Sequence, residues 1–182
     1  MIRIPSRLNI HLRSSDIALV GMMTATMEAG KFALSYLPNI EPVTLFIILY
    51  TLTFGPVVFY AIAIFILLEG LLYGFGLWWF FYLYIWPLLA LLTLLFRKQK
   101  SVWFWTVFSA MFGLTFGAMS SLITLVLSGP AAAFAYFISG IPFDLLHGAG
   151  NFILMLAMYK PLRKVLININ HHLLDKRQEE RR

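Results

Sequence analysis

The sequence predicts an all-α membrane protein, a compact bundle of six transmembrane helices with both the N- and C-termini in the cytoplasm. Hydrophobic residues make up 60% of the 182 residues and charged residues only 12%, whereas soluble domains hold roughly 45–50% and about 25%. The hydrophobic residues fall into six segments separated by proline, glycine or charged residues. The basic residues concentrate in every second connection, as the positive-inside rule requires of cytoplasmic loops.

The six predicted spans are residues 16–37, 43–54, 57–72, 78–96, 102–127 and 131–159. A helical span needs about 20 residues to cross the hydrocarbon layer, so the segment 43–54 is short for a crossing. We expect the sixth segment to bend near Gly140 and Pro142. The domain organisation that follows is a cytoplasmic tail over 1–15, the bundle over 16–160 and a second cytoplasmic tail over 161–182.

The distribution of Lys and Arg supports this count. The N-terminal tail, the turn 97–100 and the tail from Lys160 hold three, three and seven of the fourteen basic residues, and Lys31 is the remaining one. Without the short second span, the turn 97–100 would lie outside. The pattern predicts a multi-pass protein of a bacterial cytoplasmic membrane, and it explains the net charge of +6 without a nucleic-acid partner.

Charged residues inside the predicted bundle are candidates for function, because each costs about 2.5–3.5 kcal/mol at the bilayer centre. Lys31, Glu41 and Glu69 fall towards the outer half of the bundle. Glu28 lies three residues before Lys31, so the two form either a salt bridge along one helix face or part of a ligand site.

The sixth segment carries Asp144, His147 and Asn151 at i, i+3 and i+7, which places all three on one helix face. Lipid cannot satisfy such groups. They therefore line a ligand cavity or form an inter-helix hydrogen-bond cluster, and the sequence leaves both open.

The predicted outer loops contain no basic residue and are rich in aromatic residues. Asn39 lies in the loop 38–42, and Tyr73, Trp78 and Trp79 lie in the glycine-containing stretch 73–80. Aromatic residues often anchor a protein at the membrane interface. The interleaved glycines favour instead a loop that folds over a ligand.

Small residues recur at four-residue spacing in Gly21, Ala25 and Ala29, and again in Gly113 and Gly117. This spacing allows close helix packing, either inside the bundle or against another protein. No phosphate-binding loop, zinc-binding helix motif or glycine-flanked nucleophilic serine occurs. We therefore expect neither a catalytic site nor a metal or cofactor. A stand-alone secondary transporter and an intramembrane enzyme using Asp144 and His147 as acid and base are the alternatives, with a ligand-free assembly subunit as a third.

Three stretches, residues 37–43 (LPNIEPV), 69–76 (EGLLYGFG) and 140–148 (GIPFDLLHG), resemble segments of the S components of energy-coupling-factor transporters. The resemblance covers roughly residues 16–165. It implies a vitamin site in the outer half of the bundle, roofed by the loops after spans one, three and five.

The resemblance also implies partners. An S component docks on a transmembrane coupling subunit through an Ala-xxx-Ala motif on span one, which here matches Gly21 to Ala25 or Ala25 to Ala29. Two cytoplasmic ATPase subunits supply the energy, and the bundle is thought to topple to release its cargo. The pattern looks most like the cobalamin-type subgroup, while pyridoxine-related compounds, pantothenate and queuosine precursors stay open.

Overall fold

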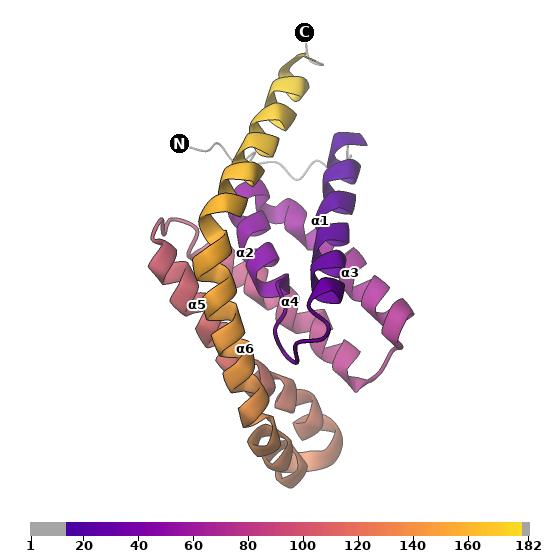
Figure 1. The fold of residues 1–182 in the computed structure, drawn as a ribbon. Coiled ribbons are helices and arrows are strands. Elements are labelled where there is room, and N and C mark those ends of the chain that lie inside the picture. The colour runs from indigo at the N-terminus through magenta and orange to yellow at the C-terminus, as the bar shows by residue number, and fades with distance from the viewer. Residues whose placement is uncertain (1–13, 180–182) are drawn as a thin grey trace.

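The computed structural model describes residues 14–179, and these residues form helices and their connections with no strand among them (Figure 1). The all-α class is therefore confirmed. The elements are α1 (Ser14–Ala33), α2 (Val43–Phe54), the 3₁₀ turn η1 (Gly55–Val57), α3 (Val58–Tyr73), α4 (Leu77–Leu95), α5 (Val102–Leu114) and α6 (Phe116–Glu179).

Three continuous helical stretches of the described chain are long and apolar enough to cross a membrane. They are Val43–Tyr73, Leu77–Leu95 and Val102–Asp175, and an 18-residue segment within each has a mean hydropathy of 2.3, 1.7 and 1.8, respectively. Helix α1 is not among them and carries Asp16, Glu28 and Lys31 within its 20 residues. The structure is thus compatible with a membrane protein, and the count of six spans stays a prediction.

The short helix α2 forms the centre of the fold. Nine of its twelve residues are buried, and it packs against α1, α3, α4 and α6. Twelve residues extend about 18 Å. Two of its three buried threonines bond to the backbone one turn earlier: Thr51 donates to the Ile47 carbonyl at 2.6 Å and Thr53 donates to the Leu49 carbonyl at 2.7 Å, whereas the Thr44 hydroxyl has no partner among the described residues. A helix that is apolar all round belongs in the interior, which explains why this segment is helical although it is short.

Two helix ends differ from those predicted. Helix α1 ends at Ala33 rather than at residue 37, and turns occupy the next residues. The predicted span 102–127 is interrupted at Thr115, where α5 ends and α6 begins. Hydropathy does not register either boundary, because the residues on both sides are equally apolar.

The predicted break at 128–130 lies inside α6, at Gly129. This residue has φ +82° and ψ 176°, a conformation open to glycine and costly for other residues. Pro130 follows and cannot donate a backbone hydrogen bond. Residues 140–142, where a bend was predicted, are helical in the structure.

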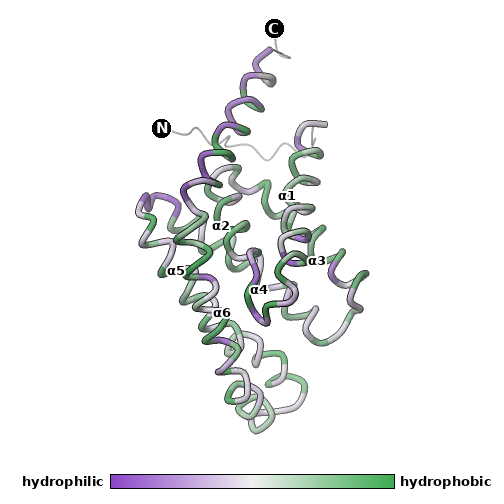
Figure 2. Tube along the Cα trace, viewed as in Figure 1, coloured by the Kyte–Doolittle hydropathy of each residue, from purple (hydrophilic) through white to green (hydrophobic). Residues whose placement is uncertain are grey.

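Helix α6 continues through Pro161 to Glu179, so the predicted boundary between bundle and tail at 160/161 is not a break in secondary structure. The last part of α6 is hydrophilic and extends beyond the other helices (Figure 2). The start of α1 and the end of α6 lie towards the same end of the molecule (Figure 1).

Candidate functional site

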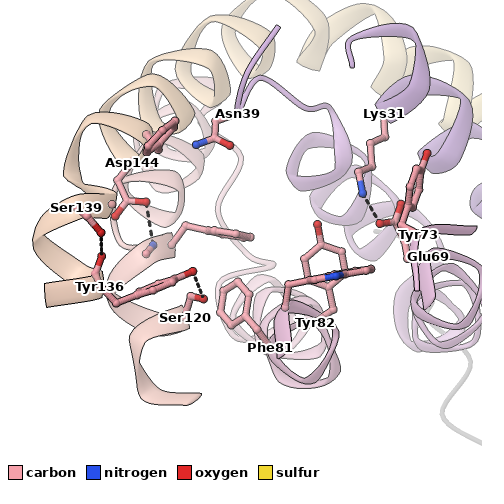
Figure 3. A pocket seen from close by; sticks show the side chains of 15 residues that line it. Lys31, Asn39, Glu69, Tyr73, Phe81, Tyr82, Ser120, Tyr136, Ser139 and Asp144 are labelled. Carbon is pink, nitrogen blue, oxygen red and sulfur yellow. Dashed lines mark hydrogen bonds and ion pairs between the residues drawn. The ribbon is translucent and has the colours of Figure 1, made fainter. Parts of the chain in front are cut away.

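A cavity of about 510 Å³ lies between the first half of α6 and the last turns of α1 and α3 (Figure 3). Five parts of the chain supply its wall: the last turns of α1 and α3, the loop before α2, the start of α4 and the first half of α6. The lining residues are Lys31, Asn39, Glu69, Tyr73, Trp78, Phe81, Tyr82, Phe116, Gly117, Ser120, Tyr136, Ser139, Gly140, Phe143 and Asp144.

A second cavity of about 360 Å³ adjoins the first beneath the loop 34–41. It shares part of its wall with the first cavity and adds Glu41 and His147. The shared residues are Lys31, Asn39, Tyr73, Tyr82 and Phe116. The two cavities therefore form one composite site.

One wall of the site carries an ion pair. Lys31 on α1 donates to Glu69 on α3, and the Lys31 ammonium lies 5.0 Å from the ring centroid of Tyr73 and 5.5 Å from that of Tyr82 (Figure 3). Glu69 is completely buried, and its Oε1 has no hydrogen-bond partner among the described residues. The spacing allowed Lys31 to pair with Glu28 on the same helix; in the structure the ion pair of Lys31 is with Glu69, because α1 packs directly on α3.

The facing wall carries Asp144 (Figure 3). Its Oδ1 accepts a hydrogen bond from the Gly117 backbone N–H at 2.9 Å. A Cβ atom at position 117 would lie 2.5 Å from Oδ2 of the same carboxyl group, so glycine is what allows the carboxyl group to reach the backbone. Gly113 likewise allows α5 and α6 to approach each other closely, since a Cβ there would lie 2.9 Å from the Asn151 amide nitrogen. The Gly113/Gly117 spacing thus belongs to internal packing.

In the second cavity His147 and Glu41 face each other. Nε2 of His147 lies 3.9 Å from Oε1 of Glu41, and the two side chains are 5% and 14% exposed. Neither atom has a hydrogen-bond partner among the described residues. Burial raises the pKa of the Glu41 carboxyl group, Lys31 lowers it and Glu69 raises it, and the net pKa is about 7.

Eight of the ten predicted binding residues line the composite site, namely Lys31, Asn39, Glu41, Glu69, Tyr73, Trp78, Asp144 and His147. That they bind a ligand stays a prediction. Asn151 and Trp79 lie elsewhere. Asn151 donates to the Ser109 carbonyl on α5 at 3.2 Å, and Trp79 donates to the Ile66 carbonyl on α3 at 2.8 Å. Both tie helices together.

Sequence reasoning missed several lining residues on α4 and α6. Tyr82 lies one helical turn after Trp78, so its position on the same face was readable from the spacing. Tyr136 and Gly140 precede Asp144 by eight and four residues, so they lie on the same face of α6, on its N-terminal side. The expected bend near residues 140–142 hid that continuation, because it ended the predicted face at Pro142.

The predicted partner surface lies on α1. Gly21, Ala25 and Ala29 are all exposed, and no atom of another described helix or loop lies within 4 Å of a Cβ placed on Gly21. The buried residues of α1 are Leu19, Val20, Met23, Thr24 and Met27. The small residues therefore form a face of their own, directed away from the bundle.

Comparisons with protein-family models, curated proteins and solved structures found no match for this chain. Within the described residues, no group of three or more His, Asp or Glu side chains has the arrangement of a metal site. The function is therefore argued from the site itself.

Proposed function

We propose that this chain is the substrate-capture subunit, or S component, of an ATP-driven energy-coupling-factor vitamin importer in a bacterial cytoplasmic membrane. The observation that carries the proposal is the composite cavity, with the Lys31–Glu69 ion pair on one wall and Asp144 on the facing wall. Ionisable groups inside an apolar bundle are expensive and mark functional sites.

The proposal includes six spans with both ends in the cytoplasm. We assign them to α1, α2, α3, α4, the stretch 102–128 and the stretch from Pro130 to about residue 159. The hydrophilic turn 97–100 and the hydrophilic end of α6 lie in the half of the molecule in which α1 begins (Figure 2). The cavity would then open outwards, where a capture subunit meets its substrate.

The size of the cavity favours a small vitamin. At the packing density of protein interiors, about 510 Å³ holds about 20 non-hydrogen atoms. Pyridoxine-related compounds, pantothenate and queuosine precursors are of that order, whereas cobalamin is several times larger. We therefore propose one of the smaller compounds, and cobalamin only if the loops open widely.

Binding is tested with the purified full-length chain in lipid nanodiscs. A thermal-shift screen against water-soluble vitamins, followed by calorimetry, should give one ligand with a dissociation constant below about 1 μM, about −8 kcal/mol. Asp144→Ala should weaken that ligand at least tenfold. Asp175→Ala, an exposed carboxylate of α6 outside both cavities, is the matched control and should leave the affinity unchanged.

The transport mechanism is tested by co-expression with a transmembrane coupling subunit and its two ATPases. We expect a complex that takes up the ligand only when ATP is hydrolysed. Uptake by the chain alone in liposomes, driven by an ion gradient, would contradict the proposal and favour a secondary transporter. The absence of any vitamin ligand would contradict it as well.

A further inference from the structure

The charged groups that line the composite site are mainly acidic. Glu69 and Asp144 line the larger cavity and Glu41 lines the smaller one, against the one lysine, Lys31, among the described residues of these walls. Glu28 also lies close enough to Lys31 and Glu69 to interact electrostatically with both. The site thus has an excess of carboxyl groups over cations.

The single lysine is already engaged. Its ammonium pairs with Glu69 and lies near the faces of Tyr73 and Tyr82. An anionic ligand on Lys31 would have to share the ammonium with Glu69, which places a second negative charge beside a completely buried carboxylate, and like charges at close range repel each other. The ion pair therefore disfavours anions.

Several acceptor atoms of the site remain open. Oδ2 of Asp144 takes no hydrogen bond from the described residues, whose single contact to this carboxyl group is the Gly117 N–H on Oδ1. Oε1 of Glu69 and Oε1 of Glu41 are buried without a partner. Buried unsatisfied acceptors are rare in native proteins and call for an explanation. A ligand that donates hydrogen bonds supplies one.

His147 provides an independent indication of the same ligand chemistry. Its side chain is 5% exposed, and its unpartnered Nε2 lies 3.9 Å from the unpartnered Oε1 of Glu41. At this separation, one donor atom can lie about 2.8 Å from both, which is hydrogen-bond distance. In the tautomer with the proton on Nδ1, Nε2 of His147 is an acceptor, and an ammonium group, with more than one N–H, satisfies both atoms at once.

Aromatic rings make up seven of the fifteen lining residues of the larger cavity: Tyr73, Trp78, Phe81, Tyr82, Phe116, Tyr136 and Phe143. Their faces stack on flat rings and attract cations. Phe81 and Tyr82 lie between the wall of Asp144 and the wall of Glu69 (Figure 3). A flat, positively charged ring fits both features of this cavity.

From these observations we propose that the site selects a compact organic cation: an aromatic or heteroaromatic ring that carries a protonated amine or a permanently charged nitrogen. The inference rests on the proposed function, because it names the charge class of the captured molecule. Asp144 and Glu41 attract the positive group, and the aromatic residues hold the ring.

The test compares matched ring compounds of opposite charge on the wild-type chain in uncharged nanodiscs at pH 7.5. The pairs are 1-methylnicotinamide against nicotinate, and 4-(aminomethyl)pyridine against isonicotinate. We expect the cation of at least one pair to bind at least tenfold more tightly than its anion. Equal affinities, or tighter binding of the anion, overturn the proposal.

Two variants locate the selectivity. Asp144→Asn retains an oxygen for Gly117 but loses the charge, so it should weaken the cation at least tenfold and change the affinity for neutral nicotinamide less than twofold. Glu41→Gln should act in the same direction if Asp144→Asn fails to fold. The matched control, Asp175→Asn, should change neither affinity. Equal losses for the cation and for nicotinamide overturn the proposal.

The remaining outcomes separate this inference from the proposed function. If none of the four probes binds but the vitamin screen yields a ligand, a cationic ligand supports the inference, and an anionic or neutral ligand overturns it while the capture function stands. If nothing binds in either experiment, the proposed function fails and the inference fails with it.

Discussion

Glu41, in the loop before α2, is a carboxyl group whose burial changes its pKa. Its carboxyl group is 14% exposed and faces Lys31 of α1, Glu69 of α3 and His147 of α6. Burial raises its pKa from 4.5 to about 7. In the unfolded chain the group ionises near pH 4.5, so between pH 4.5 and 7 the folded state binds the extra proton. Stability from this group is therefore lost as the pH rises through that interval.

Glu41→Gln removes this pH dependence. We expect the ligand-free variant and the wild type to have similar melting temperatures near pH 4.5. The variant should become more stable as the pH rises, up to a plateau above pH 7 that is worth at most about 3 kcal/mol. Melting of both proteins in one detergent across pH 4.5–8.5 measures the difference. Parallel curves over this range would show that Glu41 titrates as an ordinary surface carboxylate.

Asn151 and Asp144 lie on one face of α6, but one contacts a neighbouring helix and the other lines the cavity. Asn151 is buried, and its amide donates to Ser109 of α5, whereas Asp144 lines the cavity. The sequence placed both on one face correctly, because helical spacing fixes direction. Spacing does not reveal which neighbour each turn of that face meets, so the two roles were not separable from the sequence.

Asn151→Leu should therefore destabilise the bundle without affecting the site. Loss of one inter-helix hydrogen bond costs about 0.6–1.7 kcal/mol in membrane proteins, and the Ser109 carbonyl loses its donor. We expect a lower melting temperature and a vitamin affinity within twofold of wild type. Asp144→Asn should give the opposite result, a weaker affinity with a smaller change in melting. A large affinity loss in Asn151→Leu would place Asn151 in the site.

At the scale of helices, the sequence predicted helix ends best where a glycine, a proline or a charged residue follows or precedes the segment. The predicted limits of α2 match its ends, and those of α4 lie within one residue, because Pro42, Gly55 and Gly76 flank these helices. The break at Thr115 was missed since neither glycine nor proline marks it. The partner of Lys31 was also missed, because a contact between α1 and α3 depends on tertiary packing.

Helix α1 presents a face of small residues that the bundle leaves uncovered. Gly21→Leu combined with Ala25→Leu adds bulk at two exposed positions, and at Gly21 no other described residue lies within 4 Å of the added Cβ. We expect the melting temperature and vitamin affinity to stay unchanged and co-purification with the coupling subunit to fall at least tenfold. Ala63→Leu, on an exposed position of α3, is the matched control. Equal recovery of the complex from both variants would exclude this face as the docking surface.

For the whole molecule, the arrangement of the ends relates the cavity to the membrane. The start of α1 and the end of α6 lie towards one end, and the composite cavity lies towards the other (Figure 1). The basic residues of the turn 97–100 and of the stretch from Lys160 onwards belong to the end at which α1 starts. The positive-inside rule then predicts that the composite cavity faces the exterior and that the start of α1 and the tail of α6 face the inner side of the membrane.

This orientation is testable by labelling, because the chain has no cysteine and each introduced thiol is unique. Phe75→Cys and Ser128→Cys, both at exposed positions of the connections near the cavity end, should react with a membrane-impermeant maleimide in intact cells. Gln99→Cys and Asn168→Cys, exposed near the other end, should react only after the cells are permeabilised. If Gln99→Cys reacted from outside while Phe75→Cys was protected, the bundle would be inverted. The cavity would then open to the cytoplasm, where it could not capture a vitamin for import.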